Sequence, residues 1–248
     1  MADFSNVADD FFLNLNVQTT LNLPTNRETV LHFVEAVQKE FNEMTSFFQR
    51  ETGEFVLEGN RDSGSYRWLE LHSHRLTAGY FNPPTLADGY HMHTWLLDRS
   101  TYFLGMSGLD IECLDVAFGF NLDYQGNRDA IVAQALLANS PLASFIGGGA
   151  AKIVECEPNI VISLDDECYL QARLWLETRS NSYQIRTGEY EEEPISVYMT
   201  VRRYAQPGTI IKLKESFDLQ SKHCEDISTK IVVPQIIQPI SAAIASAG

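Results

Sequence analysis

Residues 195–233, ISVYMTVRRYAQPGTIIKLKESFDLQSKHCEDISTKIVV, contain the two patterns that decide the fold. The first is the alternation of a half-buried strand, with apolar residues on one face at Ile195, Val197, Met199 and Val201. The second follows the Pro207-Gly208 turn, where a stripe at helical spacing contains Leu219, His223, Ile227 and Ile231. We expect a strand over 194–204 and a long helix capped by Ser216, which Pro234 and Pro239 kink or end near residue 233.

The residues before this stretch predict further strands in series. Alternation at Leu170, Ala172, Leu174 and Leu176 indicates a strand over 167–178, and we expect others at 152–163 and 182–188. Asn127 is placed to cap a helix over 128–139, which Pro141 stops.

The N-terminal part repeats this mixture of elements. We expect a strand over 11–22, then a helix that begins at the capping box of Thr25 and Glu28 and reaches Phe48. Extended segments at 54–58 and 66–80 follow, then a helix of about 90–104 capped by Asp88 and a strand over 109–124.

Runs of strands bracketed by helices predict an α+β fold, with antiparallel sheets flanked by helices and a long C-terminal helix. The order of elements is similar in residues 1–125 and 126–248, so the chain has two possible αβ halves. We treat residues 1–248 as one globular unit in which these halves pack together.

Two stretches carry a resemblance to known proteins: residues 94–124, TWLLDRSTYFLGMSGLDIECLDVAFGFNLDY, and the strand and helix of 195–233. In the order of their elements, over most of 28–233, they resemble a sporadically distributed family of uncharacterised bacterial proteins. Pro234 and Pro239 depart from the uninterrupted closing helix of that family. The resemblance implies a fold and no functional residues.

Charge and cysteine spacing exclude several classes of function. The chain has 33 acidic and 18 basic residues and a net charge of -15, which repels a phosphate backbone, so we expect no nucleic acid partner. Its four cysteines form no C-x-x-C pair, which argues against a zinc ribbon or a disulfide framework. The first ten residues lack the pattern of a signal peptide, and the apolar stretch 231–247 is interrupted by prolines and polar residues. We therefore expect a soluble cytoplasmic protein with no membrane partner.

No complete catalytic motif is present, which favours a protein that is not an enzyme. The run Gly147-Gly148-Gly149 lacks the following GK[ST] and helix of a phosphate loop, so we interpret it as a flexible connection. No cofactor is predicted from the sequence.

The spacing of the histidines supports a second hypothesis, a metal site. His72 and His74 are two residues apart, and on a strand they would project from one face together with Glu70. Two histidines and one carboxylate suit Zn, Fe or Mn, so a metal-dependent enzyme or metal-binding protein stays open. His91 and His93 form a second pair of candidate ligands. In a helix they would point to different faces and could not share an ion, so they contribute only if residues 90–93 are extended.

Aromatic residues favour a binding or assembly protein that acts through a sheet face or a groove between the halves. Tyr66 and Trp68 share one face of their predicted strand and are candidate interface residues. Other aromatic side chains fall away from the aliphatic faces or in loops: Tyr80, Tyr90, Tyr169, Trp175 and Tyr198. We expect a protein partner or a homo-oligomer. A carrier with an apolar cavity between sheet and helices is the third hypothesis.

Overall fold

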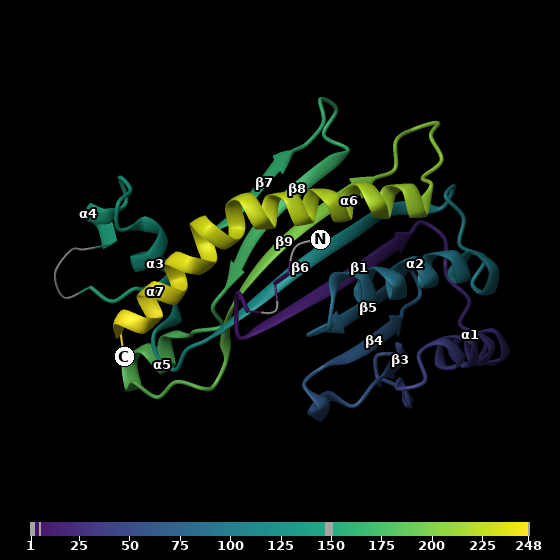
Figure 1. Cartoon of the computed structure of the whole chain (residues 1–248), viewed down its shortest axis with the longest axis horizontal. Helices are drawn as coiled ribbons and strands as arrows, with labels where there is room; N and C mark the ends of the chain where they lie inside the picture. Colours follow the sequence, from purple (N-terminus) through teal and green to yellow (C-terminus); the bar gives the residue numbers. More distant parts are fainter. Residues whose placement is uncertain (1–2, 5, 147–150, 248) are drawn as a thin grey trace.

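The computed structural model describes residues 3–4, 6–146 and 151–247 and shows an α+β protein built on one antiparallel sheet (Figure 1). The predicted loop Gly147-Gly148-Gly149 lies outside the described residues. Within the described residues the strands form a nine-stranded sheet in the order β2-β3-β4-β5-β1-β6-β9-β8-β7. The predicted α+β class, with helices flanking antiparallel strands, is confirmed.

The strands are β1 (Asp10–Thr19), β2 (Ser46–Gln49), β3 (Phe55–Glu58), β4 (Tyr66–Leu71), β5 (Arg75–Phe81), β6 (Ile111–Asp123), β7 (Asn159–Ser163), β8 (Leu170–Glu177) and β9 (Pro194–Tyr204). The helices are α1 (Arg27–Glu40), η1 (Arg61–Ser63), α2 (Leu86–Phe103), α3 (Arg128–Leu137), α4 (Ala143–Ile146), α5 (Ser182–Thr187), α6 (Leu213–Ile227), η2 (Ser228–Ile237) and α7 (Gln238–Ala247).

The two long strands β1 and β6 pair in the middle of the sheet and divide it. The strands β2 to β5 extend it on the β1 side, and β9, β8 and β7 extend it on the β6 side. On the β1 side the last strand in sequence, β5, is followed by α2. On the β6 side the last strand in sequence, β9, is followed by α6. One sheet therefore runs through the whole chain, and the division into halves 1–125 and 126–248 stays a prediction.

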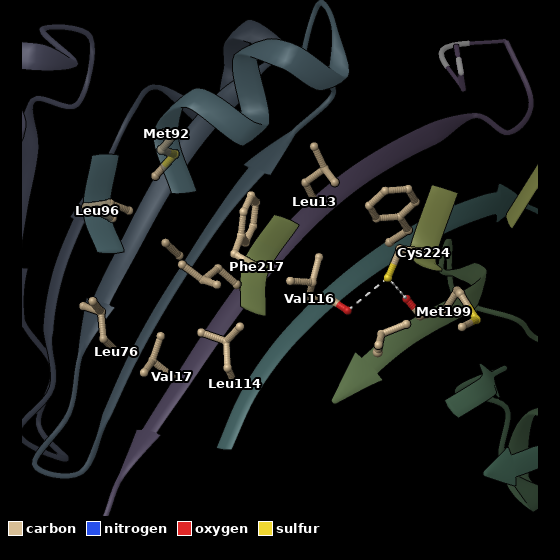
Figure 2. Packing of buried hydrophobic residues seen from close by; sticks show 14 of the residues in the cluster. Leu13, Val17, Leu76, Met92, Leu96, Leu114, Val116, Met199, Phe217 and Cys224 are labelled. Atoms are coloured by element: carbon tan, nitrogen blue, oxygen red, sulfur yellow. Dashed lines mark hydrogen bonds between the residues drawn. The ribbon is translucent and has the colours of Figure 1, made fainter. Parts of the chain in front are cut away.

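One face of the sheet carries the hydrophobic core. Alternate residues of β1 and β6, such as Leu13 and Val116, are fully buried there beside residues of α2 and α6 (Figure 2), and α1 packs against α2. Cys224 of α6 lies in this core, where its thiol is 3.3 Å from the carbonyl oxygen of Val116 and 3.9 Å from that of Met199. The alternation predicted for β8 and β9 is confirmed by burial. Leu170, Ala172 and Leu176 are buried on β8, and Ile195, Val197, Met199 and Val201 are buried on β9.

The first helix is shorter than predicted. Its cap is Asn26, whose side chain accepts a hydrogen bond from the Thr29 backbone amide, and it ends at Glu40. Phe48, which continued the helical spacing, lies instead on the edge strand β2. The segment predicted to extend over 66–80 is a hairpin of β4 and β5, and α2 is capped by Thr85 rather than Asp88.

The strand predicted at 182–188 is wrong, because this segment is the short helix α5. Asn181 accepts hydrogen bonds from the amides of Tyr183 and Gln184, and the Gln184 side chain accepts one from the Asn181 amide. Gly188 then ends the helix in the left-handed region, with φ of 77°. The strand predicted over 152–163 is also too long, since only Asn159–Ser163 pair with β8.

The C-terminal helix continues past both prolines, which corrects the predicted end near residue 233. Its ladder changes to the wider π form over Ser228–Ile237, where the missing amide of Pro234 is accommodated, and α7 follows directly. Ser216 is buried within α6 and is not its cap, because the helix begins at Leu213.

By length and composition alone, the helix over Leu213–Ala247 could cross a membrane. One such helix is weak evidence, since core helices of soluble proteins pass the same test. The first part of this helix, α6, packs against β6 and β9 (Figure 1), and 28% of its most apolar 18-residue window is buried. The cytoplasmic location stays a prediction.

Candidate functional site

The first histidine pair lies in the hairpin turn between β4 and β5, and not on a strand as predicted. The His72 ring sits between two carboxylates, with Nδ1 3.5 Å from Glu54 and Nε2 3.3 Å from Glu70. His74 is exposed in the turn. Because a turn breaks the alternation of a strand, the spacing argument that put His74 on one face with Glu70 and His72 does not apply here.

Two arginines lie beside His72 and Glu70. The Arg50 guanidinium is 2.5 Å from Glu70, and Arg75 Nη2 is 3.3 Å from His72 Nε2. Glu70 thus has a cationic partner without any ion. In the described part of the chain, no three metal-ligating side chains are placed to hold one metal. The hypothesis of a Zn, Fe or Mn site stays a prediction.

The second pair points in two directions from α2, as expected for a helix. His91 is 57% exposed and is 3.5 Å from Glu40, whereas His93 is fully buried against Phe217 of α6. Burial lowers the pKa of His93 to about 3, so the ring is neutral at physiological pH. Neither of its ring nitrogens has a hydrogen-bond partner within the described residues.

The second face of the sheet, which we call the open face, holds the residues that alternate with the core residues. Aromatic rings cross it from strand to strand in a continuous ladder. Tyr66 stacks on Phe81 at 5.2 Å, Phe81 on Phe12 at 6.1 Å, and Trp175 on Tyr198 at 5.1 Å between ring centroids. Phe12 joins the two stacks by an edge contact with Tyr198 at 5.9 Å. These rings are all partly exposed, so the ladder is accessible from solvent.

A glycine makes this ladder continuous across β6. Gly119 pairs with Phe12 on β1 and with Tyr198 on β9, so it lies between the two stacks. A Cβ atom at Gly119 would be 2.0 Å from two carbons of the Phe12 ring. The absence of a side chain therefore allows Phe12 to lie across the strand and reach Tyr198.

Part of the open face is hollowed into a groove of about 390 Å³ over β6, β9, β8 and β7. Thr200 lies between two aromatic groups of the lining, with the stack of Trp175 and Tyr198 on one side and Tyr204 on the other. The rest of the lining is polar apart from one valine: Asp115, Val161, Gln171, Arg173 and Arg202.

Two arginines in the groove differ in their charge balance. Arg202 forms two hydrogen bonds of 2.6 Å with Asp115, which raise the pKa of Arg202 and neutralise its charge. Arg173 is exposed, lies over the Trp175 ring at 5.0 Å, and donates from Nε to Asn159 at 3.0 Å. Among the described residues no carboxylate pairs with Arg173, so the groove presents one uncompensated guanidinium.

Comparisons with known proteins add little to this geometry. No family model matches the chain, and no curated protein matches it. A search of solved structures gives a likeness to the crystal structure of the di-domain ARO/CYC BexL from the BE-7585A biosynthetic pathway. It covers 95% of this chain and 98% of that one, with 5% identity and a TM-score of 0.21. This score is too low to support an inference.

The candidate interface residues of the sequence lie on the open face. Tyr66 begins the aromatic ladder, and Trp68 lies over Gly79, where a Cβ atom would be 2.4 Å from the indole nitrogen. The groove lies on the same face but toward the other end of the sheet, over β6, β9, β8 and β7. The sequence predicted only that Trp175 and Tyr198 turn away from the core. The position of Arg173 beside them follows from the alternation of β8, which was the available signal.

Proposed function

We propose that this chain is a binding protein whose ligand site is the groove on the open face, and that the ligand combines a flat ring with an acidic group. The observation that carries the proposal is the uncompensated guanidinium of Arg173 beside the stack of Trp175 and Tyr198. A flat ring fits between the aromatic groups of the lining, because stacked rings stabilise each other by about 0.5–1.5 kcal/mol beyond their burial.

The acidic group follows from charge. The chain carries a net charge of -15, so most of its surface repels anions. Arg173 is the exception in this groove, since Asp115 already neutralises Arg202. An anionic group that accepts hydrogen bonds from the free Nη atoms of Arg173 supplies the missing partner. The side chains of Gln171 and Thr200 offer further polar contacts to the same ligand.

The experiment compares two fluorescent probes that share their rings and differ in charge. The first is 1-anilinonaphthalene-8-sulfonate, and the second is N-phenyl-1-naphthylamine, which lacks the sulfonate. Each is titrated into the folded protein, into Arg173→Gln and into Arg186→Gln. Arg186 is the matched control, because it is exposed, lies 5.6 Å over the Tyr183 ring and has no carboxylate partner among the described residues, but is outside the groove.

We expect the anionic probe to bind with the higher affinity. Arg173→Gln removes a charge-assisted hydrogen bond worth roughly 1.4 kcal/mol, so its affinity for the sulfonate should fall about tenfold. Affinity for the neutral probe should stay unchanged, and Arg186→Gln should behave as the parent protein. Equal loss in the two variants, or no loss in either, would show that the anionic probe does not use this groove.

A further inference from the structure

The strand β7 is the outer edge of the sheet and is unusually apolar for that position. It pairs with β8 on one side, and all five of its residues, Asn159–Ser163, are exposed. The exposed fractions of Ile160, Val161 and Ile162 are 57%, 54% and 53%. The sequence NIVIS contains no charged residue and no proline. Both kinds of residue protect edge strands from pairing with another chain.

The backbone bonds next to β7 fix which of its residues point outward. The amide of Leu164 donates to the carbonyl of Leu170, and the amide of Leu176 donates to the carbonyl of Pro158. The backbone amides and carbonyls of the even-numbered residues therefore point toward β8. The amides and carbonyls of Asn159, Val161 and Ser163 consequently point to the free edge. They are the groups available to another strand.

We propose that two copies of this chain pair through β7, antiparallel and centred on Val161. In this register Val161 and its copy exchange both backbone hydrogen bonds, and Asn159 does the same with Ser163 of the second chain. Ile160 then lies directly opposite the copy's Ile162 on the helix side of the sheet. The strand reads polar, apolar, apolar, apolar, polar in both directions, so each residue meets one of its own kind.

The second copy is favoured over an unrelated partner because the pattern is self-complementary about one residue. Such a contact is two-fold symmetric and closes after two chains. Pairing of β7 with the other edge, β2, would leave one β7 edge and one β2 edge free, and the same contact would repeat into a filament. The dimer makes one sheet from two, and the proposal does not depend on the function of the groove.

Size and charge indicate how strong this dimer is. Five residues a side make a contact smaller than the standard interface of about 1,200–2,000 Å² in total, so the dimer should dissociate on dilution. Acidic residues follow β7 at Asp165, Asp166 and Glu167, and in the antiparallel arrangement they approach Glu155 and Glu157 of the copy. This repulsion is screened by salt, so raising the salt concentration should strengthen the dimer.

Sedimentation equilibrium over a range of protein concentrations tests the proposal. We expect a monomer–dimer equilibrium in the parent chain, and a dissociation constant raised about tenfold or more in Ile160→Lys and Ile162→Lys. Ile210→Lys is the matched control, since Ile210 is also 57% exposed but lies in a loop, and it should dimerise as the parent does. A parent that stays monomeric at all concentrations overturns the proposal.

A crosslink tests the register without relying on a disruptive variant. In a Cys168→Ser background, Val161→Cys places two thiols across the two-fold axis, about 5.5 Å apart at Cα, which a disulfide spans. Mild oxidation should give a covalent dimer in high yield, whereas Ile210→Cys should give little. Equal yields for the two variants would overturn the pairing through β7.

Discussion

Replacing Gly119 by alanine tests how the open face is built. A Cβ atom there would be 2.0 Å from two ring carbons of Phe12, so the ring has to leave its place. Phe12 then loses its contact with Phe81 at 6.1 Å and its contact with Tyr198 at 5.9 Å. At about 0.5–1.5 kcal/mol for each aromatic pair, the loss is roughly 1–3 kcal/mol.

Part of this loss is recovered because alanine restricts the unfolded chain more than glycine does. That gain is about 0.5–1 kcal/mol, so we expect Gly119→Ala to lower the free energy of unfolding by roughly 1–2 kcal/mol. For a chain of this size each kcal/mol corresponds to a shift of about 2–4 °C in Tm. Urea unfolding followed by circular dichroism measures the first quantity, and a thermal scan measures the second.

A double-mutant cycle with Phe12→Ala separates the clash between the new Cβ atom and the Phe12 ring from the effect of alanine on the unfolded chain. Without the ring, Gly119→Ala should be neutral or slightly stabilising. Gly59→Ala is the control, because its Cβ would make only ordinary contacts from 3.5 Å and its φ is not positive. If Gly119→Ala has the same effect with and without the Phe12 ring, the ladder across β6 is refuted.

Two further predictions concern buried and exposed titratable groups. The pKa of His93 is lowered to about 3 in the folded state, whereas its unfolded value is about 6.5. Stability should therefore be lost as the pH falls below about 6.5, because the unfolded chain binds a proton there and the folded chain does not. We expect His93→Leu to raise the free energy of unfolding more at pH 5 than at pH 7.5. Urea unfolding measures this effect, and an equal effect of His93→Leu at the two pH values would contradict the prediction. With 5,5′-dithiobis(2-nitrobenzoate), exposed Cys168 should react at once, whereas buried Cys113 and Cys224 should react only after denaturation; rapid reaction of all thiols in the native protein would be the contrary result.

Alternation was the part of the sequence that predicted structure well. It placed β8 and β9 with their core faces, because in both strands the predicted apolar residues are more buried than most of the residues that alternate with them. It failed at β2, where Phe48 happens to continue the spacing of α1, and at α5, where six residues are too few to show a helical period. A capping pair at Asn181 and Gln184 with a following glycine was the signal for α5.

The groove could be predicted only in part. The sequence indicated that Trp175 and Tyr198 turn away from the aliphatic residues of their strands. Their stacking depends on the pairing of β8 with β9, which places these two residues directly opposite each other. That register is set by contacts between distant parts of the chain and is not visible in either strand alone. Phe12 joins them from a strand more than a hundred residues earlier in the sequence.

The most direct test of a ligand groove on the open face is a nuclear magnetic resonance titration of the indole N–H signals. The chain has three tryptophans: Trp175 in the groove, Trp68 elsewhere on the open face, and Trp95 on α2 against Phe41. With 1-anilinonaphthalene-8-sulfonate we expect the Trp175 signal to move most and the Trp95 signal to stay in place. Movement of Trp95 or Trp68 with an unchanged Trp175 would contradict binding in this groove.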